Sequence, residues 1–160
     1  MDDTTIRLND STKRLILPQS TVSFLTYAGS IPFLLGAVLL KTGVAGQNLS
    51  FDIQHLLSVY GLVIGSFMAG TLWGQQVNIH NVWQNYLFIC SNVIALALWM
   101  AFILFSFTNL MIAYVSAFVV LLLIDHQLIR SGISNRAYFK LRFRVTLIVI
   151  LALGVAAFSV

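Results

Sequence analysis

Long apolar runs separated by short polar connections are the feature of this sequence that most restricts its fold. A helix needs about 20 mostly apolar residues to cross roughly 30 Å of hydrocarbon. Five stretches approach this length: Thr21 to Leu40, Ile53 to Trp73, Val82 to Phe105, Asn109 to Ile124 and Phe143 to Val160. Because backbone amides inside a bilayer must be paired within their own segment, each stretch is expected to be helical. The sequence therefore predicts an all-α integral membrane bundle of five transmembrane helices.

The composition is typical of an integral membrane protein. Apolar residues make up 59% of the sequence and charged residues only 9%, with a mean hydropathy of +0.91, which lies outside the range of soluble globular proteins. The net charge of +4 resides in short connections, so the expected partners are membrane lipids, and nucleic acid is not expected as a partner. Cys90 is the single cysteine, which excludes an intramolecular disulfide.

The basic residues predict how the chain is oriented. Residues 1–20 are read as a cytoplasmic N-terminal tail and residues 21–160 as one transmembrane domain. With five spans, the N-terminus and the second and fourth loops share one side. Lys41 is the only basic residue expected on the other side. The shared side holds Arg7, Lys13, Arg14, Arg130, Arg136, Lys140, Arg142 and Arg144. The positive-inside rule then predicts a cytoplasmic N-terminus and an external C-terminus. The expected location of this multi-pass chain is a bacterial inner (cytoplasmic) membrane.

Small residues in the second span form two rows at helical spacing. Such rows let neighbouring helices approach closely, and in lipid it is this packing that joins helices. The first row is Gly61, Gly65 and Ala69, and the second is Ser66, Gly70 and Gly74. Both rows are predicted to be helix-packing surfaces, which would make this helix central. The alternative is a groove that holds a lipid or quinone tail.

Polar and aromatic residues in the first three spans suggest a pocket. Pro32 follows Tyr27 in the first span, where it frees a backbone carbonyl and favours a kink. In the third span, Asn85 and Asn92 share a helical face, which we expect to look inward because amides in lipid usually bond across helices. The candidate pocket is therefore Tyr27, Pro32, Tyr60 and Asn92. A polar substrate path along the amide face is an alternative to simple packing.

Charged residues are predicted to have a structural role. Asp125 ends the fourth span and should pair with Arg142 at the start of the fifth, pinning two cytoplasmic helix ends together. The span centres contain no ionisable group, which argues against coupled transport. No acid and base, or nucleophile and base, stand in a recognisable pairing, so no enzyme, catalytic residue, cofactor site or metal site is predicted.

The histidines and the fourth loop leave alternatives open. His55, His80 and His126 are read as polar residues at span ends, with a metal or haem site as the alternative. The loop from Asp125 to Arg142 is basic and partly aromatic, which fits ordinary topology signals, an interfacial helix or a docking surface for a partner.

Several short motifs, in order, resemble a family of small membrane proteins called domain of unknown function 3429, which includes the mitochondrial transmembrane protein 69. The matching residues are Tyr27-Ala28-Gly29, Pro32-Phe33, Tyr60-Gly61, Ser66-Phe67, Gly70, Trp73-Gly74, Ser91, Trp99, Asp125, Tyr138, Leu141, Arg142 and Thr146. The family often has His before the Trp-Gly of the second span, where this chain has Leu72, so no role of that histidine is carried over. The resemblance implies a five-helix inner-membrane or mitochondrial-type protein and implies no activity.

These observations predict a non-enzymatic accessory or assembly factor for a larger membrane complex. The two small-residue rows and the basic loop suit contact with another membrane protein or with a second copy of the chain. The alternative is an uncoupled small-molecule or lipid/quinone-binding transport protein built around the candidate pocket.

Overall fold

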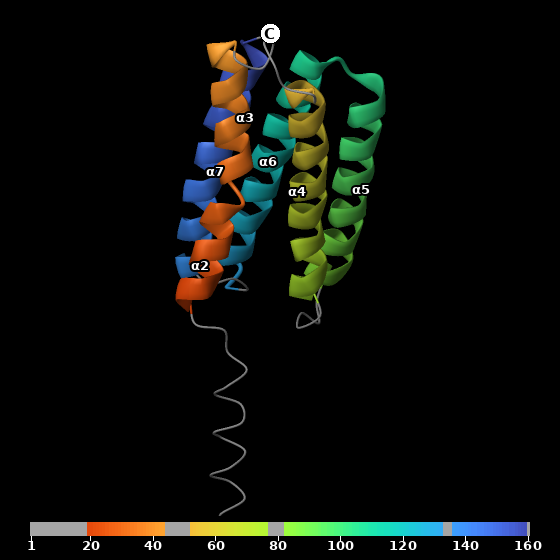
Figure 1. Ribbon diagram of the computed structural model, residues 1–160. Helices are drawn as coiled ribbons and strands as arrows, with labels where there is room; N and C mark the ends of the chain where they lie inside the picture. Colours follow the sequence, from red (N-terminus) through yellow and green to blue (C-terminus); the bar gives the residue numbers. More distant parts are fainter. Residues whose placement is uncertain (1–18, 44–51, 77–81, 133–135, 160) are drawn as a thin grey trace, which may run out of the picture.

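The computed structural model describes residues 19–43, 52–76, 82–132 and 136–159, and over these residues the regular structure is entirely helical. The helices run side by side along the long axis of the bundle, as Figure 1 shows. They are α2 Gln19–Ala28, α3 Ile31–Thr42, α4 Ile53–Gln76, α5 Val82–Leu104, α6 Phe107–Arg130 and α7 Arg136–Ala157. Of the predicted tail, residues 1–20, the part from residue 1 to residue 18 lies outside the described residues.

The first predicted span is two helices instead of one kinked helix. Helix α2 ends at Ala28, residues Gly29 and Ser30 form a turn, and α3 restarts with Pro32 in its first turn. Proline has no amide hydrogen to donate but fits the first turn of a helix, where that hydrogen has no partner within the helix. The predicted kink is therefore a full break. Helix α3 then ends at Gly43, whose left-handed backbone (φ 67°) suits glycine.

The helices that correspond to the fourth and fifth predicted spans begin before those spans, and the first of them also continues beyond its span. Apolar length places the fourth span at residues 109–124, yet α6 begins at Phe107, directly after Ser106, and continues to Arg130. Helix α7 begins at Arg136 instead of residue 143 and ends at Ala157. The loop expected from Asp125 to Arg142 is thus mostly helix, because lysine, arginine, glutamine and leucine favour helix whether or not lipid surrounds them.

Helices α4 and α6 occupy the middle of the bundle. Helix α4 packs against α3, α5 and α6, while α6 packs against α4, α5 and α7. One buried cluster surrounds Tyr114 and Met111 of α6, and a second joins Leu72 of α4 to Leu87 of α5 and Leu121 of α6. The expectation that α4 is central agrees with these neighbours.

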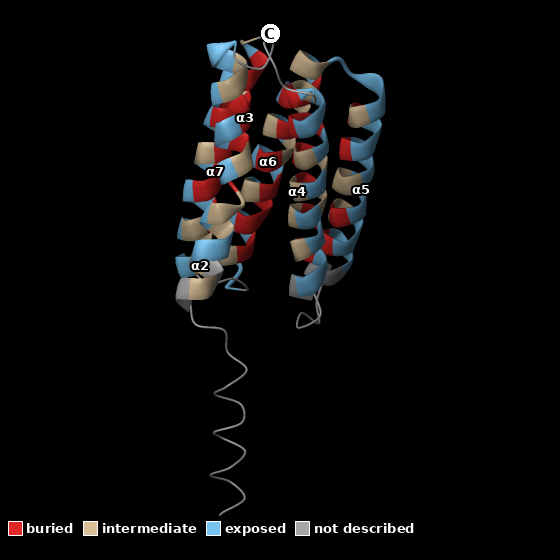
Figure 2. Cartoon of the chain, in the orientation of Figure 1, coloured by how far each residue is buried: buried red, intermediate tan, exposed pale blue. Residues whose placement is uncertain are grey.

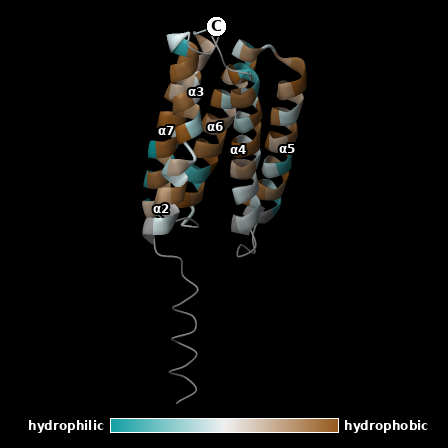
Figure 3. Cartoon of the chain, in the orientation of Figure 1, coloured by the Kyte–Doolittle hydropathy of each residue, from teal (hydrophilic) through white to brown (hydrophobic). Residues whose placement is uncertain are grey.

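Apolar side chains also cover the outside of the bundle. Phe24, Leu104 and Leu151 are among many large apolar residues that are more than half exposed. Figure 2 shows exposed residues along the outward faces of the helices, and Figure 3 shows these helices to be largely hydrophobic. So much apolar surface is unfavourable in water and suits contact with lipid.

Four helical segments are long and apolar enough to cross a membrane: Ser23–Thr42, Ile53–Gly74, Asn85–Leu104 and Phe107–Arg130. These four fit a multi-pass membrane protein. The fifth predicted span is not among them, because α7 carries Arg136, Lys140, Arg142 and Arg144 within its first turns.

Candidate functional site

A buried ion pair joins α6 to α7. Oδ2 of Asp125 lies 3.1 Å from Nη2 of Arg142, and the two side chains are 2% and 4% exposed. Asp125 precedes the end of α6 by five residues and Arg142 follows the start of α7 by six. At 1.5 Å per residue, each residue lies about 7–9 Å inside its helix end. The predicted partners are together, but they are enclosed by the bundle and do not sit at its rim.

Two hydroxyl groups accept hydrogen bonds from the Arg142 guanidinium. Nη1 donates to Oγ1 of Thr71 on α4 and to the hydroxyl of Tyr138 on α7, each at 3.0 Å. The guanidinium carbon also lies 5.7 Å from the centre of the Tyr138 ring. Thr71 in turn donates to the Met68 carbonyl at 2.7 Å. Arg142 therefore ties α4, α6 and α7 together, while its charge is neutralised by Asp125.

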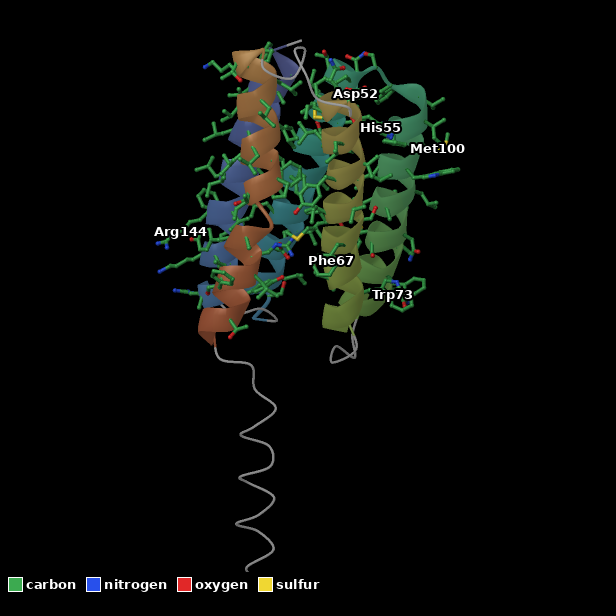
Figure 4. All side chains as sticks on the ribbon, in the orientation of Figure 1. Asp52, His55, Phe67, Trp73, Met100 and Arg144 are labelled. Atoms are coloured by element: carbon green, nitrogen blue, oxygen red, sulfur yellow. The ribbon has the colours of Figure 1, made fainter. Side chains whose placement is uncertain are left out.

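A cavity of about 450 Å³ adjoins this cluster. The residues that line it come from α2, the turn after α2, and α4, α6 and α7: Thr21, Leu25, Thr26, Gly29, Ile64, Phe67, Met68, Thr71, Phe118, Tyr138, Leu141, Arg142, Val145, Thr146 and Val149. Leu25 and Phe67 are 64% and 69% exposed, so the cavity is open between α2 and α4. Phe67 can be located on α4 in Figure 4.

The cavity has a polar end and an apolar body. Thr21, Thr71 and Tyr138 come from the start of α2, the end of α4 and the start of α7, which lie at the same end of the bundle (Figure 1). Ile64, Phe118 and Val149 line the part that extends toward the middle of the helices. This arrangement matches a molecule with one polar end and an apolar chain.

The pocket predicted from sequence is not this cavity. None of Tyr27, Pro32, Tyr60 and Asn92 lines it. The Tyr60 hydroxyl instead donates to the Gly29 carbonyl at 2.9 Å, and its ring packs 5.0 Å from that of Phe33, measured between centroids. Tyr60 thereby stabilises the turn between α2 and α3.

The amide face of α5 points outward, so the expectation that it looks inward is wrong. Asn85 and Asn92 are both exposed. Nδ2 of Asn92 donates to the Phe88 carbonyl, four residues earlier on the same helix, at 2.9 Å. A membrane helix can satisfy an amide locally in this way, which is why the presence of an amide does not determine the inward face.

The two small-residue rows of α4 have different surroundings. The first row is buried: Gly61 lies against the Tyr114 ring, and a Cβ at Gly65 would approach Leu98 to 2.8 Å. Ala69 is fully buried, and its carbonyl accepts a 2.8 Å hydrogen bond from Ser91 of α5. This row is a helix-packing surface.

The second row faces out of the bundle. Gly70 and Gly74 are exposed, and a Cβ atom added to either one would have no neighbour within 4 Å among the described residues, while Ser66 is half-buried. Within the described part of the chain, Gly70 and Gly74 therefore join no pair of helices. The prediction that the second row packs against a helix therefore stays a prediction for these two glycines.

The histidines show no shared site. His55 and His126 are exposed and lie beside the rings of Phe102 and Phe139, while His80 falls outside the described residues. Among residues 19–43, 52–76, 82–132 and 136–159, no three His, Cys, Asp or Glu side chains gather as a metal-binding group.

Sequence reasoning missed Thr71 and Tyr138 as partners of Arg142. Tyr138 lies four residues before Arg142, and that spacing would have placed both on one face had the segment been assigned to a helix. Thr71 carries no such local signal, because its position beside Arg142 depends on how α4 packs against α7.

The fold and this site define the class of protein: an all-helical chain with four membrane-capable helices, which fits a multi-pass membrane protein. Residues 18–158 match the family described as protein of unknown function (DUF3429), and the chain belongs to that family. The predicted family is confirmed, while likeness to transmembrane protein 69 stays a prediction. No curated protein and no solved structure matches the chain.

Proposed function

We propose that this protein binds a lipid-like amphiphile in the cavity between α2, α4, α6 and α7. The single observation that carries the proposal is the cavity itself, about 450 Å³ with apolar walls and polar groups at one end. That volume falls within the 300–1,000 Å³ typical of ligand pockets. The opening between α2 and α4 faces sideways, so a lipid would enter from the bilayer without crossing water.

Binding, and not chemistry, is the role proposed for the site. Asp125 is held by Arg142 at 3.1 Å, and the two described histidines are exposed. A general acid and base need matched positions around one reacting atom, and this cluster is instead arranged as a neutral anchor.

The test is the lipid content of the purified protein. The chain purified in a mild detergent should retain lipid that native mass spectrometry detects, and Ile64→Trp, which places a bulky ring in the cavity, should lose it. Leu147→Trp on the exposed face of α7 is the matched control and should retain lipid. Equal retention by Ile64→Trp and the control would contradict the proposal.

A second proposal, that the protein is an accessory or assembly factor, is favoured by the outward face of α4 and α5. Gly70 and Gly74 leave room for a close approach, and Trp73 of α4 stacks on Phe88 of α5 with ring centres 5.2 Å apart. Asn92 lies one turn from Phe88 on the same outward row, and amides and small residues are what bind membrane helices together. Gly70→Leu should release a cross-linkable partner helix while the fold is preserved.

The membrane arrangement proposed for both functions has α7 as a fifth span in a bacterial inner membrane. Helix α7 runs the length of the bundle beside α3 and α6 (Figure 1), and its residues from Val145 onward are uncharged and, apart from Thr146, carry no polar side chain. Arg130, Arg136 and Lys140 lie at one end of the bundle and Lys41 at the other. By the positive-inside rule, the end at which α2 begins is cytoplasmic and the end at which α7 ends is outside.

A further inference from the structure

The polar end of the cavity carries information about the ligand. We propose that the ligand is a neutral amphiphile whose carbonyl oxygen accepts a hydrogen bond from the Tyr138 hydroxyl, with its apolar chain lying along the cavity. This inference rests on the proposed lipid-binding function and adds the chemistry of the ligand's polar end to it.

The ion pair beside the cavity has no net charge. Arg142 would attract an acid if its charge were uncompensated, but Asp125 lies 3.1 Å from Nη2 and is equally buried. The pair is neutral as a whole. An acidic group entering the cavity would bring a net negative charge into an apolar enclosure, and burying such a charge costs several kcal/mol.

The neighbouring cations of α7 lie away from the cavity. Lys140 and Arg144 are exposed, and neither lines the cavity. Figure 4 shows Arg144 projecting from α7 on the side away from α4. No described cation other than Arg142 is therefore at hand to compensate an acid in the cavity.

The Tyr138 hydroxyl is a hydrogen-bond donor at the polar end of the cavity. The Tyr138 oxygen accepts from Nη1 of Arg142 at 3.0 Å, and its own hydrogen has no acceptor among the described residues. Thr71, the other hydroxyl on Nη1, already donates to the Met68 carbonyl at 2.7 Å. A hydroxyl that accepts from a cation is polarised and becomes a better donor. Tyr138 lines the cavity, so its hydroxyl can donate to an acceptor oxygen of the ligand.

Two kinds of membrane molecule carry this chemistry. Acylglycerols have an ester carbonyl at the end of an acyl chain, and isoprenoid quinones have a ring carbonyl at the end of an apolar tail. Both present a neutral carbonyl acceptor and one long apolar segment, and both reach the opening between Leu25 and Phe67 from the bilayer.

Photolabelling of the full chain in lipid nanodiscs tests the inference. A monoacylglycerol with a diazirine in its chain is compared with an alkyl sulfonate that carries the same chain and cannot be neutralised by a proton. Labelled peptides are identified by mass spectrometry. The neutral probe should label peptides of α2, α4 and α7 about tenfold or more over the sulfonate, because the sulfonate carries the burial cost of a charge. Unlabelled monoacylglycerol and an isoprenoid quinone, added separately as competitors, distinguish the two sources.

Variants locate the hydrogen bond. Tyr138→Phe should lower labelling by the neutral probe about three- to tenfold, which is the effect of losing one hydrogen bond. Tyr86→Phe is the matched control, since Tyr86 lies on α5, which does not line the cavity. Ile64→Trp and Val149→Phe are two independent fillings of the cavity, and either one that folds should abolish labelling.

The outcomes separate the two proposals. Equal or stronger labelling by the sulfonate, or unchanged labelling of Tyr138→Phe, would overturn the neutral-carbonyl inference while lipid binding stands. Failure of both probes to label the cavity peptides in the wild-type chain would overturn lipid binding and, with it, the inference.

Discussion

The hydroxyl of Tyr60 on α4 donates a 2.9 Å hydrogen bond to the carbonyl of Gly29, in the turn that separates α2 from α3. Carbonyls freed by a break in a membrane helix are costly unless they find a donor. Two residues earlier, the Tyr27 carbonyl accepts from both the hydroxyl and the backbone amide of Ser30, at 2.7 and 3.0 Å. The break is thus stabilised by bonds within the turn and by one from a neighbouring helix.

Tyr60→Phe should lower the free energy of unfolding by about 1 kcal/mol, the usual worth of one hydrogen bond in lipid or water. Unfolding by a denaturing detergent in mixed micelles, followed by circular dichroism, measures the change. Tyr27→Phe is the control, because the Tyr27 side chain is partly exposed and should shift the midpoint little. An equal effect of both substitutions would argue against a special role for the Gly29 contact.

The sequence predicts a kink at this point, but it predicts neither the full break nor the side chain that stabilises it. Pro32 and Gly29 disfavour a continuous helix wherever they occur, so a distortion can be predicted locally. Which side chain satisfies the freed carbonyls depends on the position of α4 relative to α3, and that is set by packing. Tyr60 is accordingly predicted as a pocket residue, although the structure uses it as a donor to the backbone.

The same limit explains the cluster around Arg142. Opposite charges at the predicted end of one span and the start of the next suggest the pair with Asp125. The depth of Asp125 and Arg142 in the bundle is not predicted. The length of an apolar run predicts where each helix ends, but α6 and α7 both continue through polar residues. The cavity beside the pair depends on four helices at once, and no local pattern encodes it.

Removing one partner of the buried pair should be severely destabilising. Asp125→Asn or Arg142→Gln leaves a charge buried at a site that is 2–4% exposed, a change that typically costs about 3–5 kcal/mol. Removing both charges together, as Asp125→Leu with Arg142→Met, should recover much of that loss. The thermal midpoint in detergent and the folded yield measure both effects.

Arg144→Gln is the control for this prediction, because Arg144 is exposed on the same helix and its loss should change stability by less than about 0.5 kcal/mol. If each single variant of the pair matched Arg144→Gln, or if the double variant were the sum of the two singles, Asp125 and Arg142 would not form a coupled anchor.

The two rows of α4 should respond differently to the same substitution. Gly61→Ala places a methyl group into the Tyr114 ring and should destabilise the fold by about 1–3 kcal/mol. Gly70→Ala meets nothing within 4 Å among the described residues and should be neutral or slightly stabilising, since alanine favours helix. Thermal midpoints of the two variants give the comparison, and the opposite order would mean that the rows are misassigned.

The orientation of α7 can be tested by cysteine accessibility in a Cys90→Ala background. Ser131 and Ser159 lie just beyond α6 and α7, at opposite ends of the bundle. If α7 spans the membrane and the basic end is cytoplasmic, Ser159→Cys should react with an impermeant thiol reagent in intact cells. Ser131→Cys should react only after the cells are permeabilised. The reverse pattern would overturn the orientation, and the same behaviour at both positions would show that α7 does not cross, because a single crossing must separate these two residues.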